Sequence, residues 1–205
     1  MSQHGSLNPG MPSGCAPLLR RRSLALALLA WTLVSPTWGA PPGRADFPDV
    51  VLHNQDGRTL RFYDDLVAGD HTVVIHFMYA QCGDICPMTT ANLARVQRLL
   101  GERAGREVRL VSISIDPEHD TPAILKAYAA LFEARPDWQF LTGRGQDILR
   151  LRRALGAFER DPARDRDKSQ HTGLLVYGNQ ARGRWSRVSA LADPQRIVAS
   201  ITRWN

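Results

Sequence analysis

The sequence predicts an α/β fold in which a mostly parallel central sheet is flanked by helices and extended by an N-terminal hairpin. Three observations predict it. Apolar, β-branched runs of strand length alternate with segments of helical periodicity. Proline and capping residues separate strands from helices, and strand pairs joined by turn residues stand at both ends of the alternating region.

The first 39 residues have the pattern of a secretory signal peptide or membrane anchor. Arg20, Arg21 and Arg22 precede the apolar run Leu24–Val34, and small residues follow it. Cleavage after Gly39 places Thr37 at position −3. The apolar run is shorter than the roughly 20 residues of a transmembrane helix. An uncleaved anchor over residues 20–40 is the alternative.

This leader predicts an exported, periplasmic protein, soluble or anchored to the inner membrane. Residues 40–48, which contain Pro-Pro-Gly, form a linker, and residues 49–205 form the folded domain. The whole chain of 205 residues carries a net charge of +6. Without the three leader arginines, 23 basic residues face 20 acidic ones, a net charge of +3. No basic block is interleaved with aromatic residues, so no nucleic-acid partner is expected.

The domain begins with a hairpin over residues 49–62. Its strands, Val50–Leu52 and Thr59–Phe62, flank an Asp56-Gly57 turn. The continuous apolar run Thr72–Tyr79 predicts a central buried strand.

Two helices with a strand between them follow. Pro87 suits the first position of a helix that runs to about Arg103. Val108–Ile115 predicts the next strand, which Asp116-Pro117 ends. Thr121-Pro122 gives the second helix an N-cap and a proline at its first position.

The remaining elements complete the alternation. Phe140-Leu141 lies in a short strand, and Asp147–Leu155 forms a helix. Thr172–Tyr177 and Arg184–Val188 pair across a loop that contains Gly178 and Gly183, and Asp193-Pro194 opens a last helix. This order of elements matches a thioredoxin-like layout with an N-terminal extension.

Cysteine usage points to chemistry more than to a structural crosslink. Cys15 falls in the leader, so the exported chain keeps Cys82 and Cys86, four positions apart. A bridge between them would close a very short loop and stabilise the fold little.

The two cysteines lie after a buried strand and open a helix, where open α/β sheets bind ligands. Cys86 is expected at the helix N-cap and Cys82 in the preceding loop. The free amides and the helix dipole lower thiol pKa values there. Both sulfurs can reach one target, which is a soft metal such as Cu(I) or zinc, or each other.

His171 offers a third donor, just before an apolar strand that is expected beside the cysteine loop. The other histidines and the methionines are weaker candidates. His76 is expected in the core, and Met78 and Met88 as core filler. We expect His53, His71 and His119 in loops or on the surface.

Three motifs in order resemble the SCO/SenC family, thioredoxin-like copper proteins that help to assemble cytochrome c oxidase. They are Cys82-x-x-x-Cys86-Pro87, the stretch Ser112–Pro122 (Ser-Ile-Ser-Ile-Asp-Pro-Glu-His-Asp-Thr-Pro), and His171 before Leu-Leu-Val-Tyr. The resemblance covers roughly residues 45–203.

The resemblance implies a copper metallochaperone that binds one copper per chain through Cys82, Cys86 and His171. Asp116 and Asp120 would shape the adjacent loop and not act as ligands. The implied partner is the copper-receiving subunit of cytochrome c oxidase, alongside other periplasmic copper or thiol carriers. Contact with a membrane is implied only through an uncleaved leader.

Two positions depart from the family pattern. Gly83 stands where the family often has proline, which loosens the loop between the cysteines. Gln170 stands where many members have aspartate, which removes a negative charge beside His171.

The rival function is an exported thiol-disulfide reductase that acts on partner cysteines through the Cys82/Cys86 pair. The sequence leaves open whether the protein is an enzyme. Two observations count against the reductase: the cysteine spacing is not C-x-x-C, and a reductase has no use for His171. A thiol peroxidase on the same fold explains neither Cys86 nor His171.

The stretch Glu159–Lys168 is densely charged with both signs. Mixed charge runs are usually solvated, so a solvated loop is expected. A surface for docking a partner is the sharper alternative.

Overall fold

The computed structural model describes residues 44–168 and 173–203. The predicted leader, residues 40–43 of the linker and His171 lie outside the described residues. One seven-stranded sheet has the order β2-β1-β5-β4-β3-β6-β7. Its strands are β1 (Val51–Asn54), β2 (Thr59–Arg61), β3 (Thr72–Met78), β4 (Val108–Ser114), β5 (Trp138–Gly143), β6 (Leu174–Asn179) and β7 (Arg184–Ser189).

The sheet is parallel at its centre and antiparallel on both sides. Strands β3, β4 and β5 run parallel to one another. The predicted hairpin β1–β2 pairs antiparallel with β5, and the hairpin β6–β7 pairs antiparallel with β3. The mixed α/β class with an N-terminal hairpin is confirmed, and its parallel part is limited to three strands.

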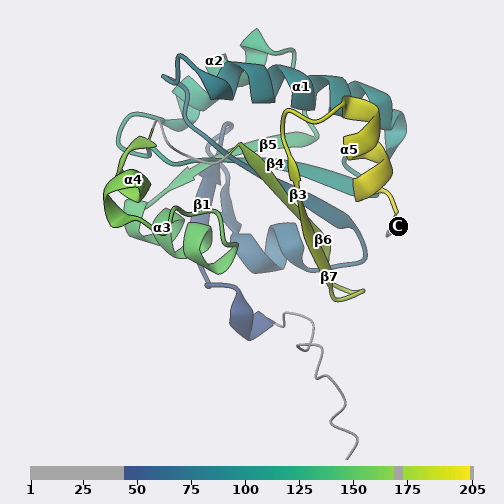
Figure 1. The fold of residues 1–205 in the computed structure, drawn as a ribbon, viewed down its shortest axis with the longest axis horizontal. Coiled ribbons are helices and arrows are strands. Elements are labelled where there is room, and N and C mark those ends of the chain that lie inside the picture. Colours follow the sequence, from purple (N-terminus) through teal and green to yellow (C-terminus); the bar gives the residue numbers. More distant parts are fainter. Residues whose placement is uncertain (1–43, 169–172, 204–205) are drawn as a thin grey trace, which may run out of the picture. The chain divides into compact units, whose positions relative to one another are not determined.

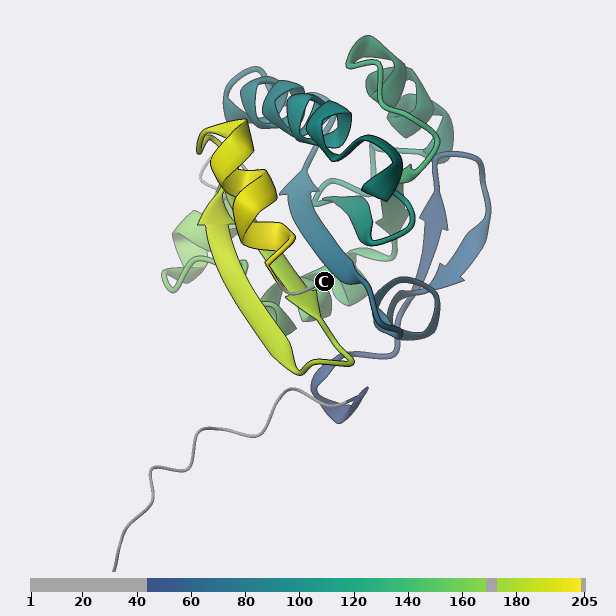
Figure 2. The same ribbon diagram turned by 90° about the vertical axis from the view of Figure 1, so that its right-hand side faces the viewer.

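Helices cover both faces of the sheet (Figures 1 and 2). One layer holds α1 (Ile85–Leu100), α2 (Pro122–Leu131) and α5 (Pro194–Ile201), and the other holds α3 (Gly145–Ala154) with the short helical segment η2 (Phe62–Val67). Val74 and Met78 of β3 pack under the first layer, whereas Ile75 and Phe77 pack under the second. This alternation is the period of a pleated strand, and it buries β3 on both faces.

Several element boundaries follow the local signals. Thr121 Oγ1 accepts the backbone N–H of Ile124 at the start of α2. Asp193 Oδ1 accepts the N–H groups of Gln195 and Arg196 at the start of α5. Both predicted caps are therefore confirmed.

Other boundaries differ from the predictions. Helix α1 begins at Ile85, so Pro87 is its third residue and Cys86 lies inside the first turn, not at the N-cap. A proline anywhere in the first turn costs no helical hydrogen bond, because those N–H groups have no partner within the helix. Gly178 lies in β6 and not in a loop, and it pairs with Trp185 of β7. A Cβ at this position would meet the Trp185 ring and the Arg184 carbonyl.

Three short elements escape the sequence analysis: η1 (Arg44–Asp46), η2 and α4 (Pro162–Arg166). The 3-10 turn η3 (Gly101–Arg103) directly follows α1 and ends where the predicted helix ends. Helix α4 lies within the charged stretch Glu159–Lys168, where a solvated loop was expected. Among the described residues, no helix is long and apolar enough to cross a membrane.

Candidate metal centre

Both cysteines lie where β3 gives way to α1. Cys82 belongs to the loop between them, and Cys86 is the second residue of α1. The two residues are 5% and 0% exposed, and both sulfurs are free thiols. They join the hydrophobic cluster that includes Met78 and Leu93. The thiols are thus in a dry environment at the carboxyl end of a central strand.

The first turn of α1 directs backbone amides at Cys82. The N–H of Cys86 donates to Cys82 Sγ over 3.4 Å. Burial opposes ionisation of Cys82, but hydrogen bonds from the Cys86 thiol and from the N–H groups of Asp84 and Cys86 outweigh it and lower the pKa of the Cys82 thiol. This is the effect expected of a helix N-terminus.

Cys86 behaves in the opposite way. Burial, followed by its hydrogen bond to Cys82, raises the pKa of the Cys86 thiol. The metal-free pair therefore has one acidic thiol, at Cys82, and one protonated thiol that donates to it. Such a pair can bind a soft cation after losing the second proton, or it can form a disulfide.

Tyr79 is a site residue that the sequence analysis did not single out. Its hydroxyl hydrogen-bonds to Cys82 and helps to lower the pKa of that thiol. Burial and this hydrogen bond raise the pKa of Tyr79 to about 12. A donor to a thiolate sulfur is a common way to tune a metal ligand. Only its place at the end of a buried strand could have drawn attention to it.

A hydrogen-bonded network lies beneath the cysteine loop. The fully buried Asp120 accepts the backbone N–H of Ala80 at 3.0 Å and the hydroxyl of Ser114 at 2.6 Å, both through Oδ2. Burial raises the pKa of this carboxyl. The backbone N–H of Asp116 in turn donates to Ser114 Oγ at 2.9 Å. The two aspartates thus fix the loop after β4 against the loop that carries Cys82.

His171 lies outside the described residues, but both flanks of its segment are described. Lys168 Nζ donates to Asp116 Oδ1 at 2.6 Å. On the other side, a Cβ on Gly173 would lie 2.7 Å from Cδ1 of Ile85, the residue before Cys86. Because β6 runs antiparallel to β3, its first residues lie at the end of β3 that precedes the cysteine loop.

The remaining histidines and methionines are dispersed. His76 is buried within β3, as predicted, and Met78 is fully buried in the core. His53 and His119 are exposed, as expected. His71 lies in the loop before β3, which is one of the two expected places, but it is buried there and bonds to the Leu66 carbonyl.

Met88 is 54% exposed and not core filler, because it lies on the outer face of α1. Within the described ranges, no three side chains of His, Cys, Asp or Glu are close enough to hold a metal ion.

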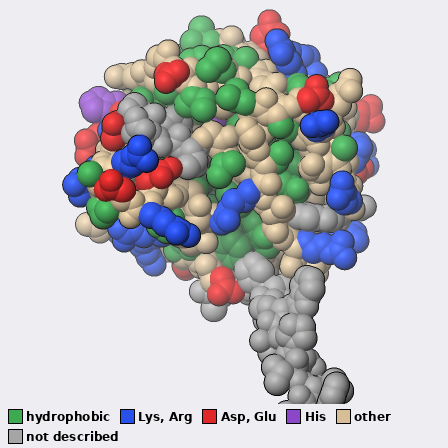
Figure 3. Space-filling view, in the orientation of Figure 1, with side chains coloured by type: hydrophobic (Ala, Val, Ile, Leu, Met, Phe, Trp, Pro, Cys, Tyr) green, Lys and Arg blue, Asp and Glu red, His purple; other side chains and the backbone are tan. Residues whose placement is uncertain are grey.

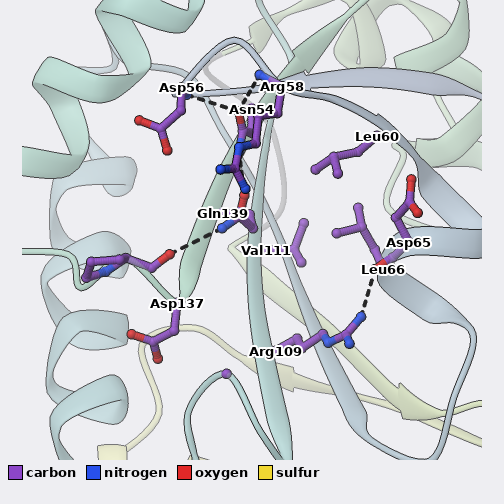
Figure 4. Close-up of a pocket in the computed structure, with 12 residues that line it drawn as sticks. Asn54, Asp56, Arg58, Leu60, Asp65, Leu66, Arg109, Val111, Asp137 and Gln139 are labelled. Carbon is purple, nitrogen blue, oxygen red and sulfur yellow. Dashed lines mark hydrogen bonds between the residues drawn. The ribbon is translucent and has the colours of Figure 1, made fainter.

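A polar groove lies away from the cysteines (Figure 4). It is lined by the residues just before and at the start of β4 and β5, including Arg109 and Asp137, together with Asn54 and Gln139. Since the cysteines follow the opposite, carboxyl end of the neighbouring parallel strand β3, the groove is not part of this site.

Comparison with known proteins identifies the family. The sequence model of SCO1/SenC matches residues 47–205. The chain belongs to the SCO1/SenC family. The SCO1 protein homolog of Bacillus subtilis is 36% identical over 100 residues, which are 48% of this chain and 50% of that protein. The chain spans about half the length of the curated SCO1/SenC relatives it matches.

Solved structures of SCO1/SenC relatives share the fold. Bradyrhizobium japonicum ScoI with copper bound is 28% identical with a TM-score of 0.61, covering 76% of this chain and 96% of that one. BsSco, described as a member of the Sco family of cytochrome c oxidase assembly proteins with a disulfide switch, is 25% identical with a TM-score of 0.60, covering 74% and 88%. The family and the thioredoxin-like fold expected from the sequence are confirmed.

Proposed function

We propose that this protein is an exported metallochaperone that binds one copper ion through Cys82, Cys86 and His171 and supports assembly of the copper centre of cytochrome c oxidase. The observation that carries the proposal is the pair of free, buried thiols at the start of α1, with an amide directed at Cys82 Sγ. Two thiolates in a dry pocket are the donors that Cu(I) prefers.

The chain on either side of His171 supports it as the third ligand. His171 is two residues from Gly173, so their Cα atoms are separated by at most about 7 Å. Gly173 packs against Ile85 and Thr89 of the first turns of α1. An imidazole is a good ligand for copper and completes a Cys₂His set.

The relatives support copper as the cargo and an oxidase subunit as the recipient. ScoI has been solved with copper bound, and BsSco is described as an oxidase assembly protein. We propose the periplasm as the compartment, with residues 1–39 as a signal peptide or anchor and residues 40–48 as a linker. Other periplasmic copper or thiol carriers are further proposed partners.

Copper binding by the reduced, purified protein tests this function. We expect one copper per chain. Cys82→Ser or Cys86→Ser abolishes tight Cu(I) binding, whereas Cys15→Ser, outside the proposed site, leaves the stoichiometry unchanged. His171→Ala weakens copper binding or changes its spectrum and leaves Cys82–Cys86 disulfide formation intact. Full Cu(I) binding by either cysteine variant of the pair contradicts the assignment.

The alternative is a thiol-disulfide reductase, and the unequal thiols favour it. An acidic Cys82 beside a protonated Cys86 is suited to attack on a partner disulfide and later resolution. A strain lacking the protein separates the two functions. Loss of oxidase activity that added copper partly restores supports the chaperone. Restoration by an added thiol reductant but never by copper supports the reductase.

A further inference from the structure

The net charge of the chain beyond the leader is concentrated in residues 144–168, which contain α3 and α4. These residues carry eight basic and five acidic side chains, a net charge of +3. Residues 40–205 together also carry +3, so the rest of that region is balanced. Figure 3 shows side chains of both charges gathered over α3 and α4. The excess charge that can attract a partner therefore lies on this one surface.

A pocket of about 400 Å³ opens between α3 and α4. Arg152 and Asp165 line it and pair with each other at 2.7 Å. Its other charged side chains form no ion pair with any described residue, and they are Arg153, Arg160, Arg166 and Glu159. Three unpaired guanidinium groups thus face one unpaired carboxylate, and guanidinium groups bind carboxylates through paired hydrogen bonds. We call this site the arginine pocket.

The arginine pocket also has an apolar part. Phe158, which lines it, is 39% exposed and is the one exposed aromatic side chain among the described residues. The half-buried Leu149 belongs to the same lining. Arginine and aromatic side chains together are typical of protein–protein interfaces. The pocket therefore fits a ligand that carries both carboxylates and an apolar group.

The shape of the arginine pocket is held by a shielded ion pair. The side chains of Arg152 and Asp165 are only 10% and 13% exposed. Asp165 Oδ1 also accepts the backbone N–H of Glu159 at 3.0 Å, and Arg152 Nε donates to the Ala157 carbonyl at 3.1 Å. These bonds join α3, α4 and the segment between them. The pocket is thus formed before a ligand binds, which lowers the entropic cost of binding.

The arginine pocket lies on the part of the chain that leads to the cysteine loop. Lys168, two residues after α4, donates to Asp116 Oδ1 at 2.6 Å. The backbone N–H of Asp116 donates to Ser114 Oγ, which donates to Asp120 Oδ2. The same Oδ2 accepts the N–H of Ala80, two residues before Cys82. A protein that binds at the pocket can therefore also reach the cysteine loop.

We infer that the arginine pocket is a docking site for an acidic segment of a partner protein. Its three unpaired arginines bind carboxylates of that segment, and Phe158 and Leu149 contact an apolar side chain between those carboxylates. An anionic membrane is the poorer fit, because segments that bind membranes present clusters of basic residues, whereas acidic residues alternate with the arginines here. The inference does not depend on the proposed copper ligands.

The test measures binding of a fluorescein-labelled peptide, Glu-Glu-Leu-Glu-Glu, to the full, reduced, metal-free chain by fluorescence polarisation. We expect binding that weakens as salt is added. The pocket variant combines Arg153→Gln, Arg160→Gln and Arg166→Gln. It weakens binding about tenfold or more, because each lost arginine removes hydrogen bonds to a charged group.

A charge-matched control separates the pocket from net charge. It combines Arg95→Gln, Arg98→Gln and Arg106→Gln, three exposed arginines that form no ion pair with any described residue. This control binds the peptide like the wild type. Copper stoichiometry, measured in the same variants, is one per chain if the proposed ligand set is correct, so the two proposals can fail separately.

Phe158→Ala tests the apolar part of the pocket. This variant weakens binding of the leucine peptide about fivefold and does not change binding of Glu-Glu-Gly-Glu-Glu. Leu131→Ala is its control, because Leu131 is 78% exposed at the end of α2 and outside the pocket.

Three results overturn the inference. The first is wild-type peptide affinity in the pocket variant. The second is an equal loss in the charge-matched control, which leaves only an effect of net charge. The third is binding to phosphatidylglycerol vesicles that the pocket variant loses and the charge-matched control keeps, which assigns the pocket to lipid headgroups instead of a protein.

Discussion

The backbone N–H of Cys86 lies against Sγ of Cys82, with a donor–acceptor distance of 3.4 Å. One cysteine of the pair thereby helps to ionise the other, through its backbone as well as through its thiol. The four-position spacing makes this possible, because Cys82 precedes the helix while Cys86 lies in its first turn.

The first prediction follows from this asymmetry. In the reduced, metal-free protein, a thiol-alkylating reagent modifies Cys82 at a lower pH than Cys86, because the pKa of Cys82 is lowered and that of Cys86 is raised. Mass spectrometry of the digested protein across a pH series measures the order. In urea the two rates become similar. Modification of Cys86 at the lower pH contradicts the assignment.

The second prediction concerns Tyr79. Tyr79→Phe removes one hydrogen bond to the Cys82 thiolate, so the pKa of Cys82 rises by about one unit. The pH profile of Cys82 alkylation shifts upward accordingly. Tyr63→Phe is the control, since Tyr63 packs on Phe47 in the other core cluster. An unshifted profile in Tyr79→Phe shows that the hydroxyl does not tune the sulfur.

The third prediction concerns the buried Asp120. Its folded-state pKa is raised by burial, so the folded protein binds this proton more tightly than the unfolded chain does. The free energy of unfolding therefore decreases as the pH rises from the pKa of Asp120 in the unfolded chain through its higher pKa in the folded protein. The Asp120→Asn variant has no carboxyl group to titrate at this position. Its free energy of unfolding therefore increases relative to that of the wild type over the same rise in pH. Urea unfolding of both proteins at a series of pH values measures this difference. The prediction is wrong if the two free energies of unfolding change with pH in parallel.

The fourth prediction concerns the ion pair that closes the charged stretch. Asp165→Ala leaves the buried Arg152 guanidinium without its carboxylate and lowers the free energy of unfolding by about 3 kcal/mol. Glu107→Ala breaks the exposed pair with Arg103 and costs under about 1 kcal/mol. Equal losses in the two variants would mean that the charged stretch contributes no more than a surface contact.

The sequence was most informative where local chemistry decides the structure. The Thr121-Pro122 and Asp193-Pro194 pairs predict their helices because capping and proline geometry act within a few residues. The run Thr72–Tyr79 predicts a central strand because a strand covered on both faces needs apolar residues on both. The position of the cysteine loop could be predicted because the loop lies between this strand and the next predicted helix.

The errors arose where distant residues decide the outcome. The pairing of Asp165 with Arg152 depends on how α3 packs, so an exposed charge run contains one ion pair that is mostly shielded from solvent. His71 lies in a loop, as expected, but its burial there against the Leu66 carbonyl is a contact that no spacing rule reveals. Tyr79 was missed because its hydroxyl is directed at Cys82 by the turn that follows β3.

The burial of both sulfurs has a kinetic consequence. Cys86 is fully buried within a hydrophobic cluster, and Cys82 is nearly so. A chelator free in solution has to wait for the loop between Tyr79 and Asp84 to open before it reaches either sulfur. A recipient that docks and opens this loop exchanges ligands without that delay. For the proposed copper cargo, this burial predicts slow loss to chelators in solution and faster transfer to a protein that docks on the loop.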